Sequence, residues 1–510
     1  MYASQSFDRW GLGDVDVLAH DGRYHLFHLV LPNHAYIAHA VSRDGFSWHR
    51  VRNALYVGHP GSWDDDMLWT MHVSPDPDHP GRWRMFYSAL SRRDRGTIQR
   101  IGLAESDDLL YWRKVDRPPF PLAIAGPDYE ASTDQGRRWI SFRDPFFCRV
   151  DDQRWLLASA RVDHGSVFRR GCVARLVEQQ SRRFQQRQPL HWPGRYDDIE
   201  VPNLFELDGR WYLVGSIQED IKVHYWYAEQ ATGPYRNFSD NVLLPRGNYA
   251  ARSCRGLDDQ LLVWCFLSAG EQMSGVAHTL PPPKQVVAQQ DGQLRLRSFS
   301  GFDTLVERSL GVAELLPARP EPAPAADEDL VADQRDGRLH LGCPSGFRRY
   351  LLRGRYGDFR LRVRLRLTRP GKCGLFFRVD EEGSGYIVSL DVTKGLAQIR
   401  AWGRQQRPGV LASYRYHQLQ AAYFYRHREM AADLELVAHG RYIELSVNGW
   451  IELSLADDRY AEGAIGFYTE GAELELSDLM LQTLGRPPGE VFDPLNLGET
   501  GEGENEGGRS

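Results

Sequence analysis

The segment DGRWYLVG at residues 208–215 indicates the architecture, because four other segments repeat its pattern of a turn followed by an aromatic or apolar strand. Asp-Gly ahead of such a run is a strong β-hairpin signal, since glycine tolerates the positive φ of the turn. The four counterparts are DGRYHLFH (21–28), GRWRMFYS (81–88), DQRWLLAS (152–159) and DDQLLVWC (258–265). Their anchor residues lie 50 to 72 positions apart and are Tyr24, Trp83, Trp155, Trp211 and Leu261.

This spacing fits one four-stranded antiparallel sheet for each repeat. A second repeat supports it, because the pattern Ala-x-Ser-x-Asp-x-x-x-Trp-x-x-Val at residues 40–51 recurs at residues 104–115. Repeated sheets of this size close radially into a β-propeller, which leaves only short, protected edges. We therefore predict an all-β fold in which residues 1–310 form a five-bladed β-propeller.

The composition changes after residue 310. Residues 311–330 include the run LLPARPEPAPAADEDL, which is typical of an extended linker. Between Phe359 and Leu367 apolar residues alternate strictly with arginine, as in a strand with one buried and one solvated face. We predict a lectin-like β-sandwich at residues 331–485 and a disordered, acidic, glycine-rich tail at residues 486–510.

Composition excludes several classes of protein. The chain has 510 residues and a formal net charge of -6, which gives no reason to expect nucleic acid as a partner. Its six cysteines form no C-x-x-C pair, which argues against a zinc site or a disulfide framework. The sequence has no run of about 18 apolar residues and no secretory signal at its start. We expect a cytoplasmic protein that does not enter a membrane, and we leave its oligomeric state open.

Three acidic residues occupy nearly the same place in three repeats. They precede the anchor of their repeat by 10 or 11 positions, and they are Asp14, Asp144 and Glu200. Because blades surround one axis, equivalent positions in different blades converge there, and we expect the three side chains to meet in one central pocket. Strand alternation places Asp16 on the same face as Asp14, and the pattern does not choose between these two.

Carboxylates that share a cleft repel one another, so their pKa values separate and one group can stay protonated near neutral pH. Cleavage of a glycosidic bond needs this arrangement. One acid protonates the leaving oxygen, and a second carboxylate attacks the anomeric carbon or activates water. The sequence therefore predicts a glycoside hydrolase, and the alternative is a non-catalytic propeller that binds carbohydrate.

The segment GSWDDDMLWT at residues 61–70 supplies further candidates for sugar binding. Carboxylates accept hydrogen bonds from sugar hydroxyls, and an indole ring can stack on the C–H face of a sugar. Trp10 is a further candidate because it stands just ahead of Asp14. A solvated loop or core packing is the alternative explanation for each of these residues. The candidates in the segment are Trp63, Asp65, Asp66 and Trp69.

The motifs around these acids resemble those of glycoside hydrolase family 32, the β-fructofuranosidases, invertases and fructanases. SFRDPFF at residues 141–147 stands where that family has its Arg-Asp-Pro block. DIEVPNLF at residues 198–205 resembles the block around the family's acid/base glutamate. The family pairs a five-bladed propeller with a C-terminal β-sandwich, so the resemblance implies the same fold that the repeats predict.

The resemblance also implies a role for each residue of the set. Asp14 would be the nucleophile, Asp144 the stabiliser of the transition state, and Glu200 the general acid/base. Arg143 would orient a carboxylate or the sugar hydroxyls. The implied reaction is hydrolysis of sucrose or fructo-oligosaccharides with retention of anomeric configuration, and it requires no metal and no organic cofactor.

The chain departs from the family pattern at three places. Gly13-Asp14-Val15-Asp16 replaces the usual Asn-Asp-Pro, Val201 replaces a cysteine, and residues 61–70 replace a serine-rich sugar-binding block. Family 43, the arabinosidases and xylosidases on the same propeller, resembles the first-blade sequence nearly as well. In that alternative the three acids would act with inversion, and Asp14 would be a general base.

Overall fold

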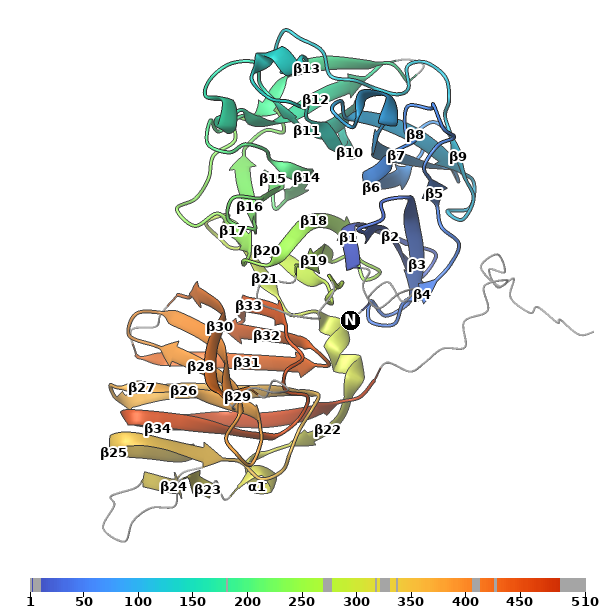
Figure 1. Cartoon of the computed structure of the whole chain (residues 1–510). Helices are drawn as coiled ribbons and strands as arrows, with labels where there is room; N and C mark the ends of the chain where they lie inside the picture. The colour runs from blue at the N-terminus through green and yellow to red at the C-terminus, as the bar shows by residue number, and fades with distance from the viewer. Residues whose placement is uncertain are drawn as a thin grey trace, which may run out of the picture.

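The computed structural model describes residue 2 and residues 11–179, 182–268, 278–316, 319–321, 331–335, 338–405, 413–425 and 429–486. Figure 1 shows two parts, a ring of five sheets viewed along its central axis and a C-terminal sheet beside it. Among these residues no helix is long and apolar enough to cross a bilayer.

The five predicted blades are confirmed, each built on a four-stranded antiparallel meander, and in the first blade a fifth strand also pairs with the third. The first blade contains β1 (Gly11–His20), β2 (Arg23–Leu31), β3 (Tyr36–Ser42), β4 (His49–Arg50) and β5 (Leu55–Tyr56). The second contains β6 (Met67–Pro75), β7 (Trp83–Leu90), β8 (Arg100–Ser106) and β9 (Trp112–Lys114). The third contains β10 (Phe142–Val150), β11 (Gln153–Arg161), β12 (Gly171–Glu178) and β13 (Phe184–His191). The fourth contains β14 (Glu200–Leu207), β15 (Arg210–Ile217), β16 (Lys222–Ala228) and β17 (Val242–Leu244). The fifth contains β18 (Asn248–Arg255), β19 (Leu261–Leu267), β20 (Lys284–Ala288) and β21 (Leu294–Arg297).

The repeated segments of the sequence form the second strand of each blade. Each anchor lies at or near the start of that strand, and all but Trp211 are buried. Burial of an apolar side chain of this size contributes about 1.5–3 kcal/mol. The repeat in the sequence therefore reflects a repeated packing requirement, one anchor for each sheet.

The repeat at residues 40–51 and 104–115 forms the same turn twice. In each copy the aspartate (Asp44 or Asp108) accepts hydrogen bonds from the backbone N–H groups two and three residues further on. The tryptophan (Trp48 or Trp112) donates its indole N–H to the carbonyl three residues before it. These local bonds explain why the spacing of the residues is the same in both blades.

The first strand of each blade lines the axis, and the first strands of neighbouring blades contact one another around the ring. Each carries a β-bulge near the end that is remote from its hairpin turn. In these bulges two residues oppose one on the partner strand, which bends the strand and re-aims its side chains. The bulges lie between Leu12 and Val15, Leu68 and Met71, Arg143 and Phe146, Glu200 and Asn203, and Tyr249 and Arg252.

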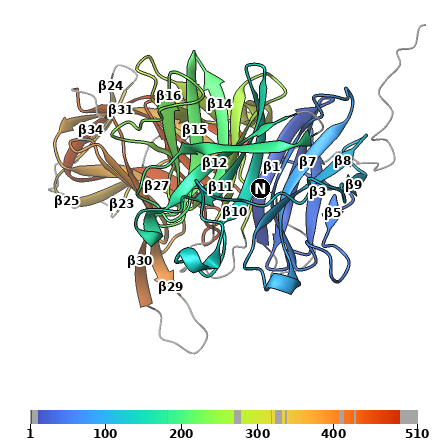
Figure 2. The same cartoon turned by 90° about the horizontal axis from the view of Figure 1, so that it is seen from above.

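The C-terminal part is the predicted β-sandwich, closed into one hydrogen-bonded sheet of 13 strands. The 21-residue strand β34 (Ala464–Leu484) joins its layers by pairing with β22, β25, β26 and β27. In Figure 2 the hairpin of β29 and β30 extends beyond the rest of this part. The other strands are β22 (Val306–Leu310), β23 (Arg319–Glu321), β24 (Val331–Arg335), β25 (Arg338–Leu351), β26 (Phe359–Arg369), β27 (Lys372–Val379), β28 (Gly385–Asp391), β29 (Leu396–Gln405), β30 (Ser413–Tyr423), β31 (Ala431–His439), β32 (Tyr442–Val447) and β33 (Trp450–Ala456).

The alternating strand predicted at residues 359–367 is β26. Its apolar residues lie in the sandwich core, whereas its arginines meet carboxylates on neighbouring strands. Arg364 lies 3.0 Å from Asp433, and Arg366 lies 2.9 Å from Glu475. The arginine face is thus partly neutralised by cross-strand pairs, which suits an exposed sheet surface.

The C-terminal sheet takes its first strand, β22, from the last residues of the range expected for the propeller. The range expected as a linker contains α1 (Val312–Leu315) and β23, and its residues 322–330 lie outside the described residues. The expected tail, apart from residue 486, also lies outside them.

The two parts pack directly on each other. Tyr442 of β32 belongs to the same apolar cluster as Phe302 and Trp264 of the propeller side. Polar contacts fix the register of this interface, since the Asn248 side-chain amide donates to the Ser454 carbonyl at 2.9 Å. The sandwich therefore supports the blade that closes the ring.

The first blade buries several histidines. His25 Nδ1 lies 3.1 Å from His39 Nε2, and His28 Nε2 lies 3.1 Å from the Tyr2 hydroxyl. Burial lowers the pKa of His25 and of His28 from 6.5 to about 3. These rings are therefore neutral in the folded protein at any ordinary pH.

We expect the free energy of unfolding to fall as the pH decreases from about 6.5 towards 3. In that window the unfolded chain protonates these histidines and the folded chain does not, so proton binding favours unfolding. Each group costs about 1.4 kcal/mol per pH unit, or roughly 2 kcal/mol at pH 5. Urea unfolding at pH 7 and pH 5 measures the difference.

Replacing His25 with phenylalanine should make this pH dependence shallower, because one titrating group is lost. The exposed His59 offers the control, and His59→Gln should leave the dependence unchanged. If the unfolding free energy of His25→Phe changed with pH as it does in the parent, burial of a neutral His25 would not be a source of the pH dependence.

Candidate active site

The three acids predicted from the repeats lie at equivalent bulges of three blades. Asp14 is within the bulge of β1, Asp144 is within that of β10, and Glu200 directly precedes that of β14. Asp144 and Val201 have φ values of 59° and 50°. This left-handed conformation costs a residue with a Cβ atom roughly 1–2 kcal/mol, and such strain gathers at functional sites.

Arg143 links two of the acids. Its Nη2 donates to Glu200 Oε1 at 2.6 Å, and its Nε lies 3.5 Å from Asp144 Oδ2. The Val201 N–H donates to Asp144 Oδ2 at 3.0 Å. The left-handed conformation of Val201 is thus accompanied by a hydrogen bond from its own N–H group to the carboxylate. The carboxylate of Asp144 is therefore held in one orientation between blades 3 and 4.

Asp14 belongs to the same cluster. Burial raises its pKa to about 7, and the negative charges of Asp144 and Glu200 contribute to the rise. The Thr70 hydroxyl, from the bulge of β6, donates to Asp14 Oδ2 and opposes it. Asp14, Asp144 and Glu200 all stand at the bulges of first strands that contact one another around the ring, so their carboxyl groups share one site near the axis.

Burial also raises the pKa of Glu200. The positive charge of Arg143 opposes this rise, and the charge of Asp144 adds to it. The Tyr249 hydroxyl, from β18 of the fifth blade, donates to Glu200 Oε2. The net effect of these surroundings on Glu200 is a raised pKa, which favours the protonated form of its carboxyl group.

Asp16 has a different environment from Asp14. The Val73 N–H donates to its Oδ2 at 2.6 Å, and its Oδ1 lies 3.2 Å from His72 Nδ1. The bulge at residues 13–14 breaks the strand alternation, which is why the two aspartates do not share a surrounding. Asp16 ties β1 to β6, and Asp14 is the one that meets the other acids.

The sugar-binding candidates at residues 61–70 have different surroundings in the structure. Trp63 stacks on Tyr87 with ring centroids 5.6 Å apart. The Asp65 carboxylate accepts the backbone N–H groups of Gly61 at 2.8 Å and Arg92 at 2.9 Å, which lowers its pKa. Both side chains are therefore engaged within their own blade.

Asp66 lies 3.8 Å from Arg92 Nε at the surface of the second blade. Trp69 shares the bulge of β6 with Thr70, so it stands next to the residue that contacts Asp14. Its indole N–H is buried and has no hydrogen-bond partner among the described residues. Trp10 lies outside the described residues.

Reasoning from the acids alone missed Thr70 and Tyr249, which occupy the corresponding positions of the second and fifth blades. They precede the anchors Trp83 and Leu261 by 13 and 12 residues, slightly more than the acids do. Longer hairpin turns in these blades account for the larger offset. A count of 10 or 11 residues back from these anchors reaches His72 and Val73 in the second blade and Ala250 and Ala251 in the fifth, so the sequence alone did not identify Thr70 or Tyr249.

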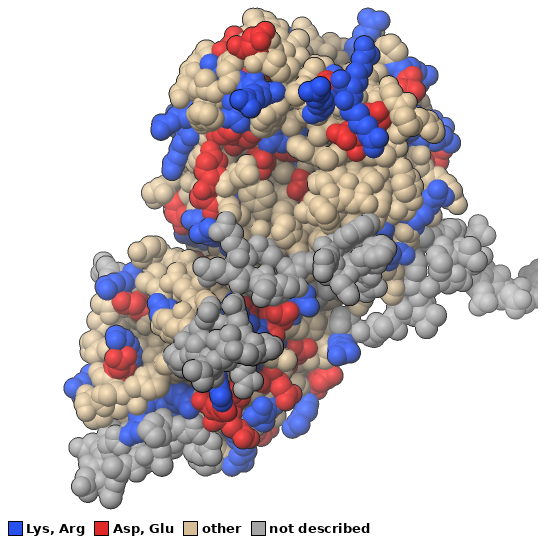
Figure 3. Space-filling model, in the orientation of Figure 1, with Lys and Arg blue, Asp and Glu red and all other residues tan. Residues whose placement is uncertain are grey.

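In the space-filling view acidic side chains lie in and beside a hollow at the centre of the propeller (Figure 3). Within the described part of the chain, no group of three or more His, Cys, Asp or Glu side chains is arranged to hold a metal ion. The acidic cluster, next to Arg143, offers carboxyl groups for proton transfer and nucleophilic attack.

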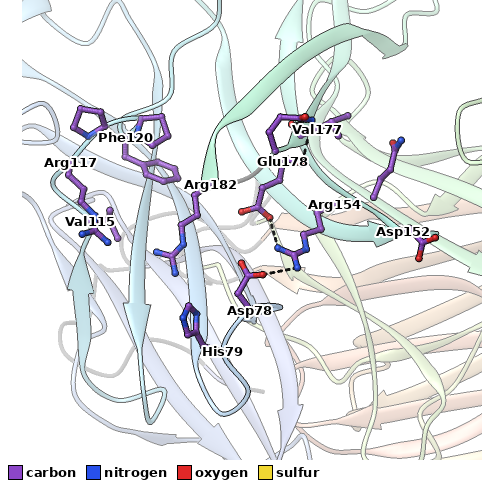
Figure 4. A pocket seen from close by; sticks show the side chains of 14 residues that line it. Asp78, His79, Val115, Arg117, Phe120, Asp152, Arg154, Val177, Glu178 and Arg182 are labelled. Carbon is purple, nitrogen blue, oxygen red and sulfur yellow. Dashed lines mark hydrogen bonds and ion pairs between the residues drawn. The ribbon is translucent and has the colours of Figure 1, made fainter.

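A separate cavity of about 950 Å³ lies between the second and third blades (Figure 4). It opens at the hairpin ends of β6 and β10, whereas Asp144 lies near the other end of β10. Arg154 spans it, with contacts to Asp78 at 2.8 Å and Glu178 at 3.6 Å. This cavity is not part of the acidic cluster.

Comparison with known proteins agrees with the geometry. Residues 15–295 match the sequence model of the N-terminal domain of glycosyl hydrolases family 32. No curated protein matches the chain in sequence.

Solved structures of similar fold cover nearly the whole chain. The exo-inulinase of Aspergillus awamori has a TM-score of 0.67 at 13% identity, over 93% of this chain and 96% of that one. The sucrose-6-phosphate hydrolase of Lactobacillus gasseri has a TM-score of 0.65 at 14% identity, over 93% and 91%. A Bombyx mori β-fructofuranosidase has a TM-score of 0.62 at 16% identity, also over 93% and 91%. At these identities the similarity shows the shared fold.

Proposed function

Because the chain belongs to glycoside hydrolase family 32, we propose that it is a retaining β-fructofuranosidase that acts on sucrose or fructo-oligosaccharides. The observation that carries the proposal is the meeting of Asp14, Asp144 and Glu200 in one cluster, in which Arg143 contacts both Asp144 and Glu200. Each comes from a different blade, at the level where every inner strand bulges.

In the proposed reaction Glu200 gives its proton to the glycosidic oxygen while a carboxylate oxygen of Asp14 attacks the anomeric carbon. The bond from that carbon to the leaving oxygen breaks, and a covalent glycosyl-enzyme forms. Glu200 then removes a proton from water, which attacks the same carbon and releases Asp14. Asp144 stabilises the positive charge that develops on the sugar ring.

The protonation of the cluster supports these roles. Burial raises the pKa of Asp14 and of Glu200, and the negative charge of Asp144 adds to the rise in both. Thr70 favours the ionised form of Asp14 by donating a hydrogen bond to it. One ionised and one protonated carboxyl group are what the first step of the reaction requires.

The names of the structural neighbours favour a fructoside substrate. They include an exo-inulinase, a sucrose-6-phosphate hydrolase and a Bombyx mori β-fructofuranosidase, a variant of which was solved with sucrose. The sequence departs from the family 32 pattern at Gly13-Asp14-Val15-Asp16 and at residues 61–70. The test of function therefore includes arabinosides and xylosides as alternative substrates.

A substrate screen with methanol present tests the proposal. Sucrose, inulin-type oligosaccharides and aryl β-fructofuranosides should be hydrolysed, and methanol should trap the intermediate as methyl β-fructofuranoside, whose anomer NMR identifies. Turnover of arabinofuranosides or xylosides alone, with no methyl glycoside, would favour the inverting alternative. Binding without turnover, unchanged in Glu200→Gln, would favour a carbohydrate-binding propeller.

A further inference from the structure

Asp198 is a fourth acid at the cluster, and neither the repeats nor the motifs assign it a role. It precedes Glu200 by two residues, and its side chain is buried. Its Oδ2 accepts hydrogen bonds from Arg143 Nη2 at 3.2 Å and from Arg161 Nη2 at 2.8 Å. Its Oδ1 accepts one from the Ser141 hydroxyl at 3.1 Å.

The same nitrogen of Arg143 serves both acids. Nη2 donates to Glu200 at 2.6 Å and to Asp198 at 3.2 Å, while Nη1 donates to Ser141 Oγ at 2.6 Å. Nη1 also donates to Gln99 Oε1 at 3.5 Å, and Nε lies 3.5 Å from Asp144 Oδ2. The guanidinium therefore faces three carboxylates, and its charge is divided among them.

Arg161 anchors Asp198 from the other side. Arg161 is fully buried, and its guanidinium lies 3.9 Å from the ring centre of Trp139. Arg143 lies over the same ring at 5.4 Å. The two arginines and Asp198 thus form a packed unit that has little freedom to rearrange.

This arrangement matters because Arg143 opposes protonation of Glu200. An arginine in contact with a single carboxylate stabilises the ionised form, typically by 1–3 pKa units. Sharing the guanidinium with Asp198 weakens that effect, and the charge of Asp198 itself raises the pKa of Glu200.

We propose that Asp198 is a positioning residue of the acid/base step, which holds Arg143 between two carboxylates so that Glu200 can carry the proton destined for the leaving group. The inference rests on the proposed function.

The neighbouring Asp197 provides the matched control. It pairs with Arg137 at 2.9 and 2.8 Å and lies 3.6 Å from Arg161. Its contacts run to Arg137 and Arg161 instead of Arg143, so Asp197→Asn removes a similar charge from the same segment without changing the partner of Glu200.

The kinetic test compares Asp198→Asn, Asp197→Asn and the unmodified enzyme on sucrose and on an aryl fructofuranoside with a good leaving group. In Asp198→Asn the alkaline limb of the kcat/KM profile should move down by roughly one pH unit. At pH values above that limb, its kcat/KM on sucrose should fall by up to about 10-fold, which is what a shift of about one unit allows. The change on the aryl substrate, which needs little protonation, should be less than about 3-fold. Asp198→Glu should recover part of the loss, and Asp197→Asn should keep the original profile.

An unmoved alkaline limb, or equal losses on both substrates, would overturn the proposal. If Asp198→Asn does not fold, Ser141→Ala carries the test, because that hydroxyl bridges Asp198 and Arg143. Ser141→Ala should move the limb in the same direction by a smaller amount, and no movement would count equally against the proposal.

A titration without turnover separates this inference from the proposed function. In protein carrying ¹³C-carboxyl glutamate, the signal missing from Glu200→Gln identifies Glu200, and NMR follows its midpoint. A lower midpoint in Asp198→Asn, with Asp197→Asn unchanged, supports the charge sharing even if no fructoside is hydrolysed. In that case the proposed function alone fails, whereas equal midpoints overturn the role of Asp198.

Discussion

Replacing Asp14 with asparagine is expected to lower kcat for fructoside hydrolysis by about 10⁴-fold or more, because an amide cannot attack the anomeric carbon. The loss should appear in single-turnover measurements as well, since the first chemical step is the one removed. The substitution should not lower the stability of the folded protein. Burial raises the pKa of Asp14 to about 7, so its ionisation disfavours the folded state as the pH rises from about 4 through 7, and the variant should melt no lower than the parent at pH 8.

Asp16→Asn is the comparison for this experiment. Asp16 holds the Val73 N–H and His72, so its loss should lower the melting temperature. Per folded molecule, hydrolysis should stay within about 10-fold of the parent, well above the loss expected from a missing nucleophile. If Asp16→Asn abolished hydrolysis and Asp14→Asn did not, the choice of nucleophile would be wrong.

Replacing Arg84 with methionine should have the largest effect on stability. Arg84 is fully buried on β7 and contacts Asp76 at 2.9 Å, Asp78 at 2.8 Å and Glu178 at 2.9 Å. Removal of one partner from a buried ionic network leaves charges without compensation, which costs about 3–5 kcal/mol. Urea unfolding at pH 7 measures this loss.

Arg82→Met is the matched control, because Arg82 pairs with Asp107 at the surface, where both side chains are about half exposed. That pair should contribute less than about 1 kcal/mol. Arg84 contacts acids that line the cavity of Figure 4, at the hairpin ends of β6 and β10, so kcat per folded molecule should be retained. Equal stability of the two variants would show that the buried network contributes little.

The five blades could be predicted because their signals are local. Asp-Gly turns, aromatic anchors and the aspartate turns at Asp44 and Asp108 each depend on residues a few positions apart. Their repetition then implies the ring. The sandwich followed in the same way from alternation along β26, whose outward arginines are paired with carboxylates of neighbouring strands.

The acids could be located because they keep a nearly constant offset from the anchors, and that offset is set by one hairpin in each blade. The bulge at residues 13–14 gives Asp14 and Asp16 different surroundings, and it is visible only in the pairing of β1 with β2. The loop acid Asp65 looked available in the sequence, and its use by Gly61 and Arg92 became visible only with the loop folded.

Local pattern was thus sufficient for the architecture and for the level in each blade at which the acids stand. Closure of the ring determined the contacts between blades. Thr70 contacts Asp14, 56 positions away in the chain, and Tyr249 contacts Glu200, 49 positions away. Such pairs have no signature in sequence, because their distance depends on how neighbouring blades pack rather than on periodicity within one strand. The sharing of Arg143 between Glu200 and Asp198, on which protonation depends, is a consequence of the same packing.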